Sequence, residues 1–370
     1  MNSAQDFDVI VIGAGIAGAS VAYFLAPHGR VALVEREAQP GYHSTGRSAA
    51  VFAPSYGPPQ VRALTRASRT FLQAVPGVLT PRGSLFPARA LQLDALHGLH
   101  ERLIAESARG VKLLDTRAAQ ALVPVLRDEA VAAALYDEDA NDIDVYALHQ
   151  HYLRGAKAAR ATLVCDFDVQ RLVFTAGLWE VGDAMRTLHA PVIVNAAGAW
   201  ADVLGALAGA RPLGLQPKRR SAFTFAPPDG LQTRAWPVVV GIDEDFYFKP
   251  DAGVLLGSPA NADAVEAHDV VAEELDIATG IARIEAATTL TIHRPLHTWA
   301  GLRSFVPDGA LVGGFDDALP GFFWCCGQGG YGIQSSAAMG AACAARITGR
   351  PLPHYITDQG LTFEDLRCRR

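Results

Sequence analysis

The stretch Val9-Ile10-Val11-Ile12-Gly13-Ala14-Gly15-Ile16-Ala17-Gly18 decides how the fold of this chain is interpreted. Its first four residues are all β-branched, which predicts a strand that is buried on both faces. The pattern Gly13-x-Gly15-x-x-Gly18 follows at once. Its glycines permit, in order, a tight turn, a close approach of the backbone to a pyrophosphate, and close packing of a helix on the strand. We expect this helix to end near Leu25, and its unpaired N-terminal N–H groups favour an anion.

A second strand and an acidic residue complete the pattern. Residues 31–34 predict another buried strand, which ends at Glu35. A carboxylate here accepts hydrogen bonds from ribose hydroxyls and repels a 2′-phosphate, so the unit is expected to bind an adenosine dinucleotide without that phosphate. The uncharged run 9–27 could also suggest a membrane span. Its glycines and strand-like opening argue against a span, and the acidic Asp6 and Asp8 before it argue against a signal peptide.

Composition narrows the class of protein. The chain has 370 residues, of which 50% are hydrophobic and 19% charged, and this predicts a globular enzyme of two domains. A net charge of −6 argues against nucleic acid and anionic membrane surfaces as partners. Five cysteines without a C-x-x-C pattern favour a reducing cytoplasm. Pro295 between His293 and His297 argues against a helical metal pair, so no metal is expected.

The segments after the dinucleotide unit permit more than one interpretation. Residues 41–50 are rich in small and hydroxyl-bearing side chains, which suits either a flexible surface loop or a backbone that lies against a flat ligand. Tyr56 follows on a loop that could act as a lid. Beyond Pro81 the pattern changes to short strands at residues 84–86 and 90–93, and this change predicts the start of a second domain.

Two later strand ends are also rich in small residues. Residues 191–200 predict a buried strand that ends either in an ordinary turn or close to a cofactor. Residues 321–326 predict another strand, and a turn with four glycines and a helix through Met339 follow it. The N-terminus of that helix is suited to place partial positive charge near a developing anion.

Two groups of basic residues are candidates for a binding site. Lys218, Arg219 and Arg220 are expected just before a strand near Phe223, either as a solvated cluster or with one side chain in a pocket. Arg303 stands alone among apolar residues, and such an arginine is seldom buried without a partner.

Taken together, these segments resemble, in order along nearly the whole chain, the FAD-dependent D-amino acid oxidase superfamily. The resemblance rests on the N-terminal glycine pattern with Glu35, and on residues 44–48 (Ser-Thr-Gly-Arg-Ser), 195–200 (Asn-Ala-Ala-Gly-Ala-Trp), 301–303 (Gly-Leu-Arg) and 329–332 (Gly-Gly-Tyr-Gly). Within the superfamily, four runs look closest to the bacterial D-arginine dehydrogenases, namely 41–50, 217–221, 251–253 and 257–261.

The resemblance implies an α/β fold in which a Rossmann-like FAD-binding domain is interleaved with a substrate domain built on a large mixed or antiparallel sheet. It implies an FAD-binding domain from residues 1–80, 142–212 and 300–370, and a substrate domain from residues 83–141 and 213–299. It also implies that FAD is held non-covalently. The residues then expected to contact FAD are Gly13, Gly15, Ile16, Ala17, Gly18, Glu35, Arg36, Ser44, Thr45, Arg47, Ser48, Ala49, Ala197, Gly198, Trp200, Gly301, Arg303, Gly329, Gly330, Tyr331, Gly332, Ile333 and Gln334.

The resemblance further implies how an amino acid substrate would be held and oxidised. Arg220 and Arg303 would bind its carboxylate, because the guanidinium fork matches two carboxylate oxygens. Tyr247 and Tyr56 would add hydroxyl contacts, and the other residues expected at the reacting carbon are Gly332 and Gln334. The expected reaction is hydride transfer from Cα to flavin N5 without a dedicated base, followed by hydrolysis of the imino acid to a 2-oxo acid and ammonia.

Departures from the resemblance bear on the substrate. Where arginine-preferring relatives carry an acidic residue after a Pro-Arg pair, this chain reads Gly83-Ser84, and the apolar Val51, Phe52 and Ala53 replace expected polar residues. We therefore expect a broad or apolar side-chain preference. The alternative is an enzyme of the same fold that acts on 2-hydroxy acids or on secondary amines such as proline or sarcosine, or on glycine, and a covalent flavin at His43 or Cys325 would favour it.

Two further classes agree less well with the sequence. A flavoprotein without turnover would not need both arginines and Tyr247, and an NAD-dependent dehydrogenase would not need the second glycine-rich segment. The expected electron acceptor is a quinone or another respiratory carrier, with oxygen as the alternative. We expect a cytoplasmic protein, with the periphery of the inner membrane as the alternative location. We expect a monomer, although no residue pattern determines the oligomeric state.

Overall fold

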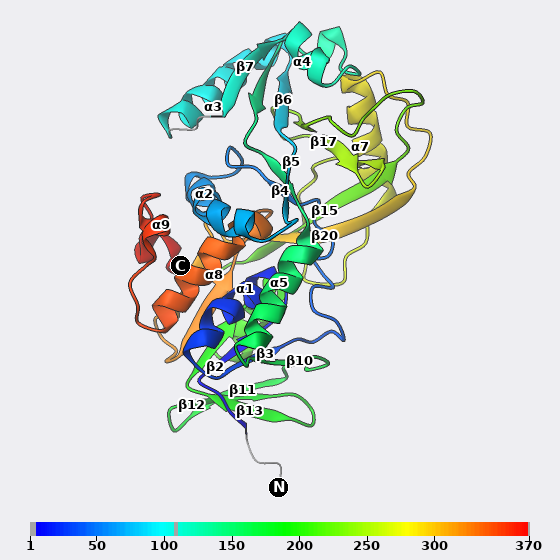
Figure 1. Ribbon diagram of the computed structural model, residues 1–370. Helices are drawn as coiled ribbons and strands as arrows, with labels where there is room; N and C mark the ends of the chain where they lie inside the picture. Colours follow the sequence, from blue (N-terminus) through cyan, green and yellow to red (C-terminus); the bar gives the residue numbers. More distant parts are fainter. Residues whose placement is uncertain (1–4, 107–109, 369–370) are drawn as a thin grey trace.

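The computed structural model describes residues 5–106 and 110–368. Its lower half is built on a sheet of parallel strands, in the order β10-β3-β2-β14-β22, with the antiparallel β21 at one edge (Figure 1). The strands of this sheet are β2 (Val9–Ile12), β3 (Val31–Val34), β10 (Thr162–Val164), β14 (Val192–Asn195), β21 (Val312–Phe315) and β22 (Phe322–Cys326). The predicted buried strands at residues 9–12 and 31–34 are therefore present, and all of their residues are buried.

Helices cover one face of this sheet, and a small second sheet covers the other. The first group is α1 (Ile16–Leu25), α2 (Pro59–Ala74), α5 (Val145–Ala158) and α8 (Gly332–Ile347), which pack on one another. The second sheet comprises β1 (Gln5–Asp6), β11 (Arg171–Thr175), β12 (Leu178–Gly182) and β13 (Thr187–Ala190). Its Trp179 and Val181 enter the same core cluster as Ile10 and Trp324 of the parallel sheet, so both faces of that sheet are buried.

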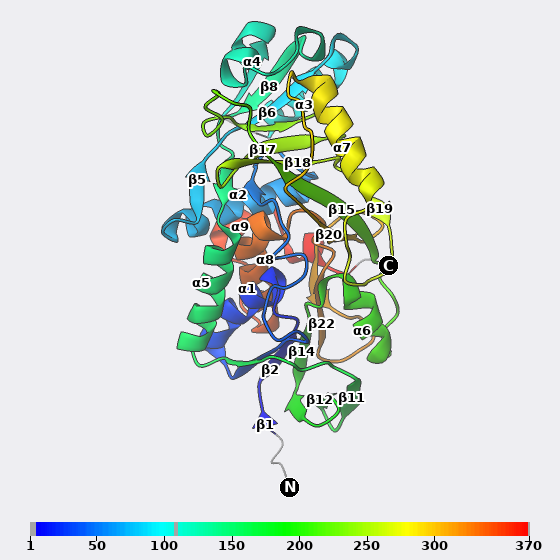
Figure 2. The ribbon, with the colours of Figure 1, turned by 90° about the vertical axis from the view of Figure 1, so that its right-hand side faces the viewer.

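The upper half is a larger sheet, ordered β19-β15-β18-β17-β16-β6-β8-β7, with β20 paired to β15. Its strands are β6 (Ser84–Ala88), β7 (Val111–Asp115), β8 (Ala133–Asp137), β15 (Gln216–Phe225), β16 (Val238–Val240), β17 (Tyr247–Asp251), β18 (Val254–Ser258), β19 (Asp263–Ala264) and β20 (His297–Phe305). The pairs are antiparallel except β16 with β6. The helices of this half are α3 (Leu93–Ala105), α4 (Thr116–Leu122) and α7 (Glu274–Ala287). Helix α7 packs on β15 and β18 (Figure 2).

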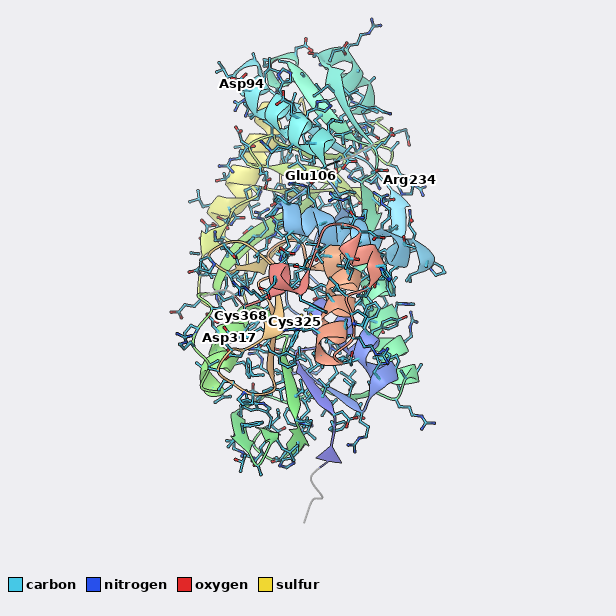
Figure 3. The ribbon with its side chains drawn as sticks, turned by 90° about the vertical axis from the view of Figure 1, so that its left-hand side faces the viewer. Asp94, Glu106, Arg234, Asp317, Cys325 and Cys368 are labelled. Carbon is cyan, nitrogen blue, oxygen red and sulfur yellow. The ribbon has the colours of Figure 1, made fainter. Side chains whose placement is uncertain are left out.

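Shorter elements connect the two halves. A sheet of β4 (Val51–Phe52), β9 (Asn141–Ile143) and β5 (Leu79–Pro81) lies between them. Short helices follow some strands and helices, namely η1 (Ala26–His28), η2 (Ala90–Gln92), η3 (Asp128–Ala130), η4 (Gly198–Trp200), α6 (Ala201–Leu207), α9 (His354–Thr357) and η5 (Phe363–Leu366). Arg62 of α2 pairs with Glu106 at the end of α3, which Figure 3 labels. This ion pair ties the helical layer to the upper half.

Two predictions of local structure were wrong. Residues 90–93 were predicted as a strand, but they form η2 and the first residue of α3, because the Gln92 side chain accepts a hydrogen bond from the Arg89 N–H and starts a helical turn. Lys218, Arg219 and Arg220 were expected before a strand, but they lie within β15, which begins at Gln216. The predicted α/β fold with a large, mainly antiparallel sheet is confirmed.

Two other observations concern the chain as a whole. Within residues 5–106 and 110–368, no helix combines the length and the apolar character that crossing a bilayer requires. The proposed division of the chain into domains at residues 80, 142, 212 and 300 stays a prediction.

Candidate active site

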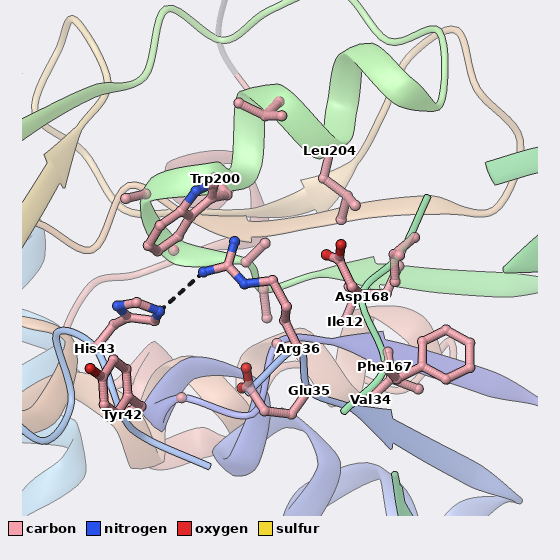
Figure 4. A pocket seen from close by; sticks show the side chains of 18 of the residues that line it. Ile12, Val34, Glu35, Arg36, Tyr42, His43, Phe167, Asp168, Trp200 and Leu204 are labelled. Atoms are coloured by element: carbon pink, nitrogen blue, oxygen red, sulfur yellow. Dashed lines mark hydrogen bonds between the residues drawn. The ribbon is translucent and has the colours of Figure 1, made fainter. Parts of the chain in front are cut away.

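A cavity of about 600 Å³ opens at the carboxyl ends of β2, β3 and β14. Gly13 and Gly15 follow β2, Glu35 and Arg36 follow β3, and Trp200 stands beyond β14. All five residues line this first cavity, and Figure 4 shows Glu35, Arg36 and Trp200 around it. The carboxyl edge of a parallel sheet is where doubly wound folds bind their ligands.

The turn after β2 has room only for glycine at two positions. Gly13 has φ +100°, and a Cβ added there would lie 2.5 Å from the carbonyl oxygen of Ala196. A Cβ added at Gly18 would lie 1.8 Å from the Gly13 carbonyl oxygen. Any side chain at either position would therefore force β2, α1 and the segment after β14 apart.

Glu35 and Thr45 organise the entrance of helix α1. Glu35 accepts hydrogen bonds from the backbone N–H groups of Ala14 (2.8 Å) and Glu37 (3.0 Å), and its carboxylate lines the first cavity. The Thr45 hydroxyl accepts a hydrogen bond of 2.9 Å from the Ile16 N–H. The Ile16 N–H at the start of α1 is thus already paired, and the preceding residue, Gly15, lines the cavity.

Arg36 closes one wall of the first cavity. Its guanidinium carbon lies 4.5 Å from the centroid of a Trp200 ring, and its Nη2 lies 3.1 Å from His43 Nε2 (Figure 4). His43 is also bonded to Glu37, and this hydrogen bond lowers the pKa of the Glu37 carboxyl below its ordinary value. The group presents a flat cation and aromatic faces to a ligand.

A second cavity of about 150 Å³ continues from the first. The residues common to both are Gly15, Ser44, Thr45, Ala196, Gly198 and Ala199. The first turn of α8, which begins at Gly332, lines its far end together with Gly329 and Gly330. The open N–H groups of a helix start therefore border the second cavity.

A third cavity of about 90 Å³ lies beside the second, between the large sheet and residues 48–56. Arg220, Tyr247 and Arg303 line both of these cavities. The other walls of the third cavity are mostly apolar. They are formed by Val51, Ala53, Phe86, Val238 and Val240, and the polar residues are Ser48, Tyr56, Ser84 and Gln334.

Arg220 and Arg303 lie in adjacent strands without an acidic partner. Within the residues that the structure describes, neither guanidinium forms an ion pair with a carboxylate, although Arg219 on the opposite face of β15 pairs with Asp263 and Asp276. Burial, and then the neighbouring Arg303, lower the pKa of Arg220 below its ordinary value. Two partly desolvated cations with no ion-pair contact among the described residues favour an anion with two oxygens in the cavity that they share, although Glu244 lies near enough to oppose the fall in the pKa of Arg220.

Tyr56 covers this cavity. Its hydroxyl donates to Glu244 (3.2 Å), and its ring lies 5.3 Å from that of Tyr331. Gln334 accepts a hydrogen bond of 2.9 Å from the Ala53 N–H, whereas its own buried Nε2 has no partner among the described atoms. The loop that carries Ala53 and Tyr56 is thus held at both residues, and the unpaired donor Gln334 Nε2 lies next to the cavity.

The structure brings most of the predicted site residues to these three cavities. Gly18 does not line them and packs on the turn instead, and Tyr331 packs against Tyr56 and Phe305. The sequence analysis missed the residues that close the outer end of the first cavity, namely Phe167, Asp168, Val169, Gln170, Val203, Leu204 and Leu207. It also missed Glu244, for which the sequence holds no signal.

The two residues considered for a covalent flavin lie on different cavities. His43 lines the first cavity and is held by Arg36 and Glu37. Cys325, which Figure 3 labels, lines the second cavity. Its Sγ lies 3.9 Å from that of Cys343. Both contacts are internal to the protein, so the structure gives neither residue a geometry that demands a covalent bond.

Comparison with known proteins agrees with this geometry. Residues 8–346 match the family described as FAD dependent oxidoreductase (DAO). The chain belongs to this family. This FAD-dependent oxidoreductase is 24% identical to hydrogen cyanide synthase subunit HcnC of Pseudomonas aeruginosa, with 94% of each chain covered. Glycine oxidase from Geobacillus kaustophilus has a similar structure (TM-score 0.84, 22% identity, 99% of each chain), as does iminodiacetate oxidase from Chelativorans sp. BNC1 (TM-score 0.80, 25% identity, 97% and 98%).

The residues of the first two cavities fit the FAD that this family uses. The two cavities share six lining residues, and the turn at Gly13 leaves no room for a Cβ. Glu35 stands where an adenosine ribose would be bound, and the start of α8 would meet the electron-rich end of the flavin. The third cavity lies next to the second and shares Arg220, Tyr247 and Arg303 with it.

Asp269, which lines none of the cavities, holds the loop of residues 41–47 through a clamp with Tyr42 and Arg47. Arg47 donates to Asp269 (2.5 Å) and to the Val270 carbonyl (2.9 Å), and the Tyr42 hydroxyl donates to Asp269 (3.1 Å). The hydrogen bond from Arg47 is the main cause that lowers the pKa of the Asp269 carboxyl. Because Tyr42 and Arg47 line the FAD cavities, the clamp keeps this loop closed over them.

We expect Asp269→Asn to release FAD about two- to fivefold faster, because a half-exposed ion pair contributes little more than this factor. The rise of flavin fluorescence after dilution measures the release rate. Glu266→Gln is the matched control, because Glu266 is exposed on the same segment. An equal rate for both variants would show that the clamp does not retain FAD.

Proposed function

We propose that this FAD-dependent oxidoreductase oxidises D-amino acids of broad or apolar side chain to 2-oxo acids and ammonia. The observation that carries the proposal is the pair Arg220 and Arg303, which has no carboxylate partner among the described residues and faces a small apolar cavity beside the FAD space. The likeness of four sequence runs to bacterial D-arginine dehydrogenases supports the D-configuration. We propose a quinone or another carrier, rather than oxygen, as the electron acceptor.

The chain's own residues bind and orient the substrate in this proposal. Arg220 and Arg303 hold the carboxylate, and Tyr247 donates a hydroxyl hydrogen bond to it. The Tyr56 hydroxyl donates another when it turns from Glu244 to the substrate. Gly332 and the free Nε2 of Gln334 border the Cα–N bond. When bound, FAD supplies the hydride acceptor, N5. No side chain is required as a base, because the neutral substrate amine can donate its lone pair as the C–H bond breaks.

The walls of the third cavity favour an apolar side chain. Val51, Phe86 and Val238 leave a charged side chain without a partner on the wall, and burial of an unpaired charge is costly. Asp137 pairs with Ser84 in the strand register, but this carboxyl does not line the cavity, and burial raises its pKa. We therefore expect D-leucine, D-methionine and D-phenylalanine to be oxidised with higher kcat/KM than D-arginine and D-lysine.

A second candidate function is the oxidation of secondary amines, glycine or 2-hydroxy acids. The paired arginines would bind the carboxylate of any of these compounds. The solved relatives include an enzyme named glycine oxidase and one named iminodiacetate oxidase, and iminodiacetate is a secondary amine.

An anaerobic substrate panel tests the proposal. The holoenzyme is mixed with D- and L-amino acids, sarcosine, proline, glycine and 2-hydroxy acids, while loss of the oxidised flavin band is followed. Rapid bleaching by apolar D-amino acids, ahead of all other classes, is the expected result. Faster bleaching by sarcosine, proline, glycine or a hydroxy acid would establish the second candidate instead, and a lead for D-arginine would overturn the apolar preference.

A further inference from the structure

One edge of the Arg220 guanidinium is already occupied by the protein. Its Nε donates a hydrogen bond of 2.5 Å to the backbone carbonyl of Asn261. A guanidinium has five N–H donors on a rigid plane, so a bond at Nε fixes the plane and leaves the Nη edge for another ligand. Because Arg220 lines the second and third cavities, this free edge borders the proposed substrate site.

Asn261 is itself fixed by every polar atom of its side chain. Its Oδ1 accepts a hydrogen bond of 2.8 Å from the Ser221 N–H, next to Arg220 in β15. Its Nδ2 donates to Asp276 (2.9 Å) and to Asp263 (2.7 Å). In the reverse orientation the amide NH₂ would face the Ser221 N–H, and the amide oxygen would face two carboxylates. The hydrogen bonds therefore define which atom is the oxygen and which the nitrogen.

Asp276 connects this asparagine to helix α7. The same carboxylate oxygen accepts hydrogen bonds from the Ser221 hydroxyl (2.7 Å) and from Arg219 Nε (2.9 Å). Only 12% of the Asp276 side chain is exposed. Helix α7, on the far side of β15, therefore holds Asn261 rigidly, and Asn261 in turn holds Arg220.

We propose that Asn261 is the positioning residue that directs the Nη edge of Arg220 toward the substrate carboxylate. This inference rests on the proposed function, in which Arg220 binds that carboxylate. Asn261 lines none of the three cavities, so it acts through Arg220 alone. Without its hydrogen bonds, the long arginine side chain would sample several rotamers, and binding would have to restrict them.

A double-mutant cycle on the holoenzyme tests this inference. The probe is 4-methylpentanoate, a carboxylate with an apolar chain and no amine, and its Kd is read from the shift of the flavin spectrum. Asn261→Ala is expected to weaken binding about tenfold, because the backbone carbonyl that holds Arg220 Nε loses the side-chain hydrogen bonds that fix its position. In an Arg220→Met background, the same change is expected to alter Kd less than about twofold, because the residue through which it acts is gone.

Two further variants make the test specific. Asn141→Ala is the matched control, because Asn141 lines none of the three cavities and its side chain donates to the nearby Asp139 carbonyl. If Asn261→Ala does not retain FAD, Asp276→Asn is tested in its place, because this change keeps the volume of the side chain. Asp276→Asn is expected to weaken binding of the probe several-fold. Unchanged probe binding by Asn261→Ala, or an equal loss with Arg220 present and replaced, would overturn the positioning role but leave the proposed function. Failure of the unaltered enzyme to bind the probe would overturn both.

Discussion

Replacing Arg303 by methionine is expected to lower kcat/KM for an accepted amino acid by about 10²–10³-fold, because truncating one member of a desolvated charge pair costs about 3–4 kcal/mol. Methionine keeps much of the side-chain length but has no donor for the carboxylate. The space around Arg303 is built for the guanidinium, since a Cβ added at Gly330 would lie 2.7 Å from its Cζ. Steady-state kinetics over a range of substrate concentrations measure the effect.

Arg127→Met is the matched control for this variant. Arg127 is partly buried and donates to the carbonyls of Glu285 and Thr288, but it lines none of the cavities. Its replacement is expected to leave kcat/KM within about twofold, since substitutions away from a site act mainly on stability. If Arg303→Met kept more than a tenth of the original kcat/KM with FAD bound, Arg303 would not hold the substrate carboxylate.

Gly13→Ala is expected to weaken FAD binding about 30-fold or more, because strained backbone and overpacking together cost at least about 2 kcal/mol. The glycine has φ +100°, and the new methyl would collide with the Ala196 carbonyl 2.5 Å away. Relief requires β2 and the segment after β14 to separate, and both line the FAD cavity. The FAD content after gel filtration, and titration of the apoprotein with FAD, measure the loss.

A glycine outside the site supplies the control. Gly98 lies in α3, where a Cβ would meet only the flexible end of Arg102 at 3.4 Å. Gly98→Ala is therefore expected to keep full FAD content and to raise the stability of the protein slightly, as alanine favours helix more than glycine does. If Gly13→Ala bound FAD as tightly as this control, the turn would not be part of the FAD site.

Local patterns in the sequence predict the dinucleotide-binding part of the fold. Strand, glycine turn and helix up to Leu25 depend on neighbouring residues, and the structure has them where the pattern predicts. The place of Arg220 was harder to predict, because the first residues of β15 are polar and do not show the pattern of a strand. Once the strand is known, its two-residue alternation explains why Arg219 pairs with acids on one face while Arg220 lines the cavity on the other.

Contacts between distant segments could not be predicted from the sequence. Tyr56 and Glu244 are 188 residues apart and meet only because the lid loop folds over the β16–β17 turn. Asp168, in the loop before β11, and Leu204, in α6, complete the first cavity, and neither lies in a sequence pattern that marks it as a ligand contact. The contacts between distant segments depend on tertiary packing, which overrides local preference. Residues 90–93 are a local case, because a hydrogen bond that the Gln92 side chain accepts from the Arg89 N–H decides their conformation.

The rate of flavin reduction by D-leucine and by D-leucinamide shows whether the two arginines bind the substrate carboxylate. The two compounds share the Cα–H bond, the amine and the side chain, and differ in the carboxylate that Arg220 and Arg303 are proposed to bind. Stopped-flow mixing without oxygen gives the reduction rate at each concentration. The account predicts that D-leucine reduces the flavin with at least about 100-fold higher second-order efficiency, because two charge-assisted contacts are lost in the amide. Equal efficiency for acid and amide would contradict it.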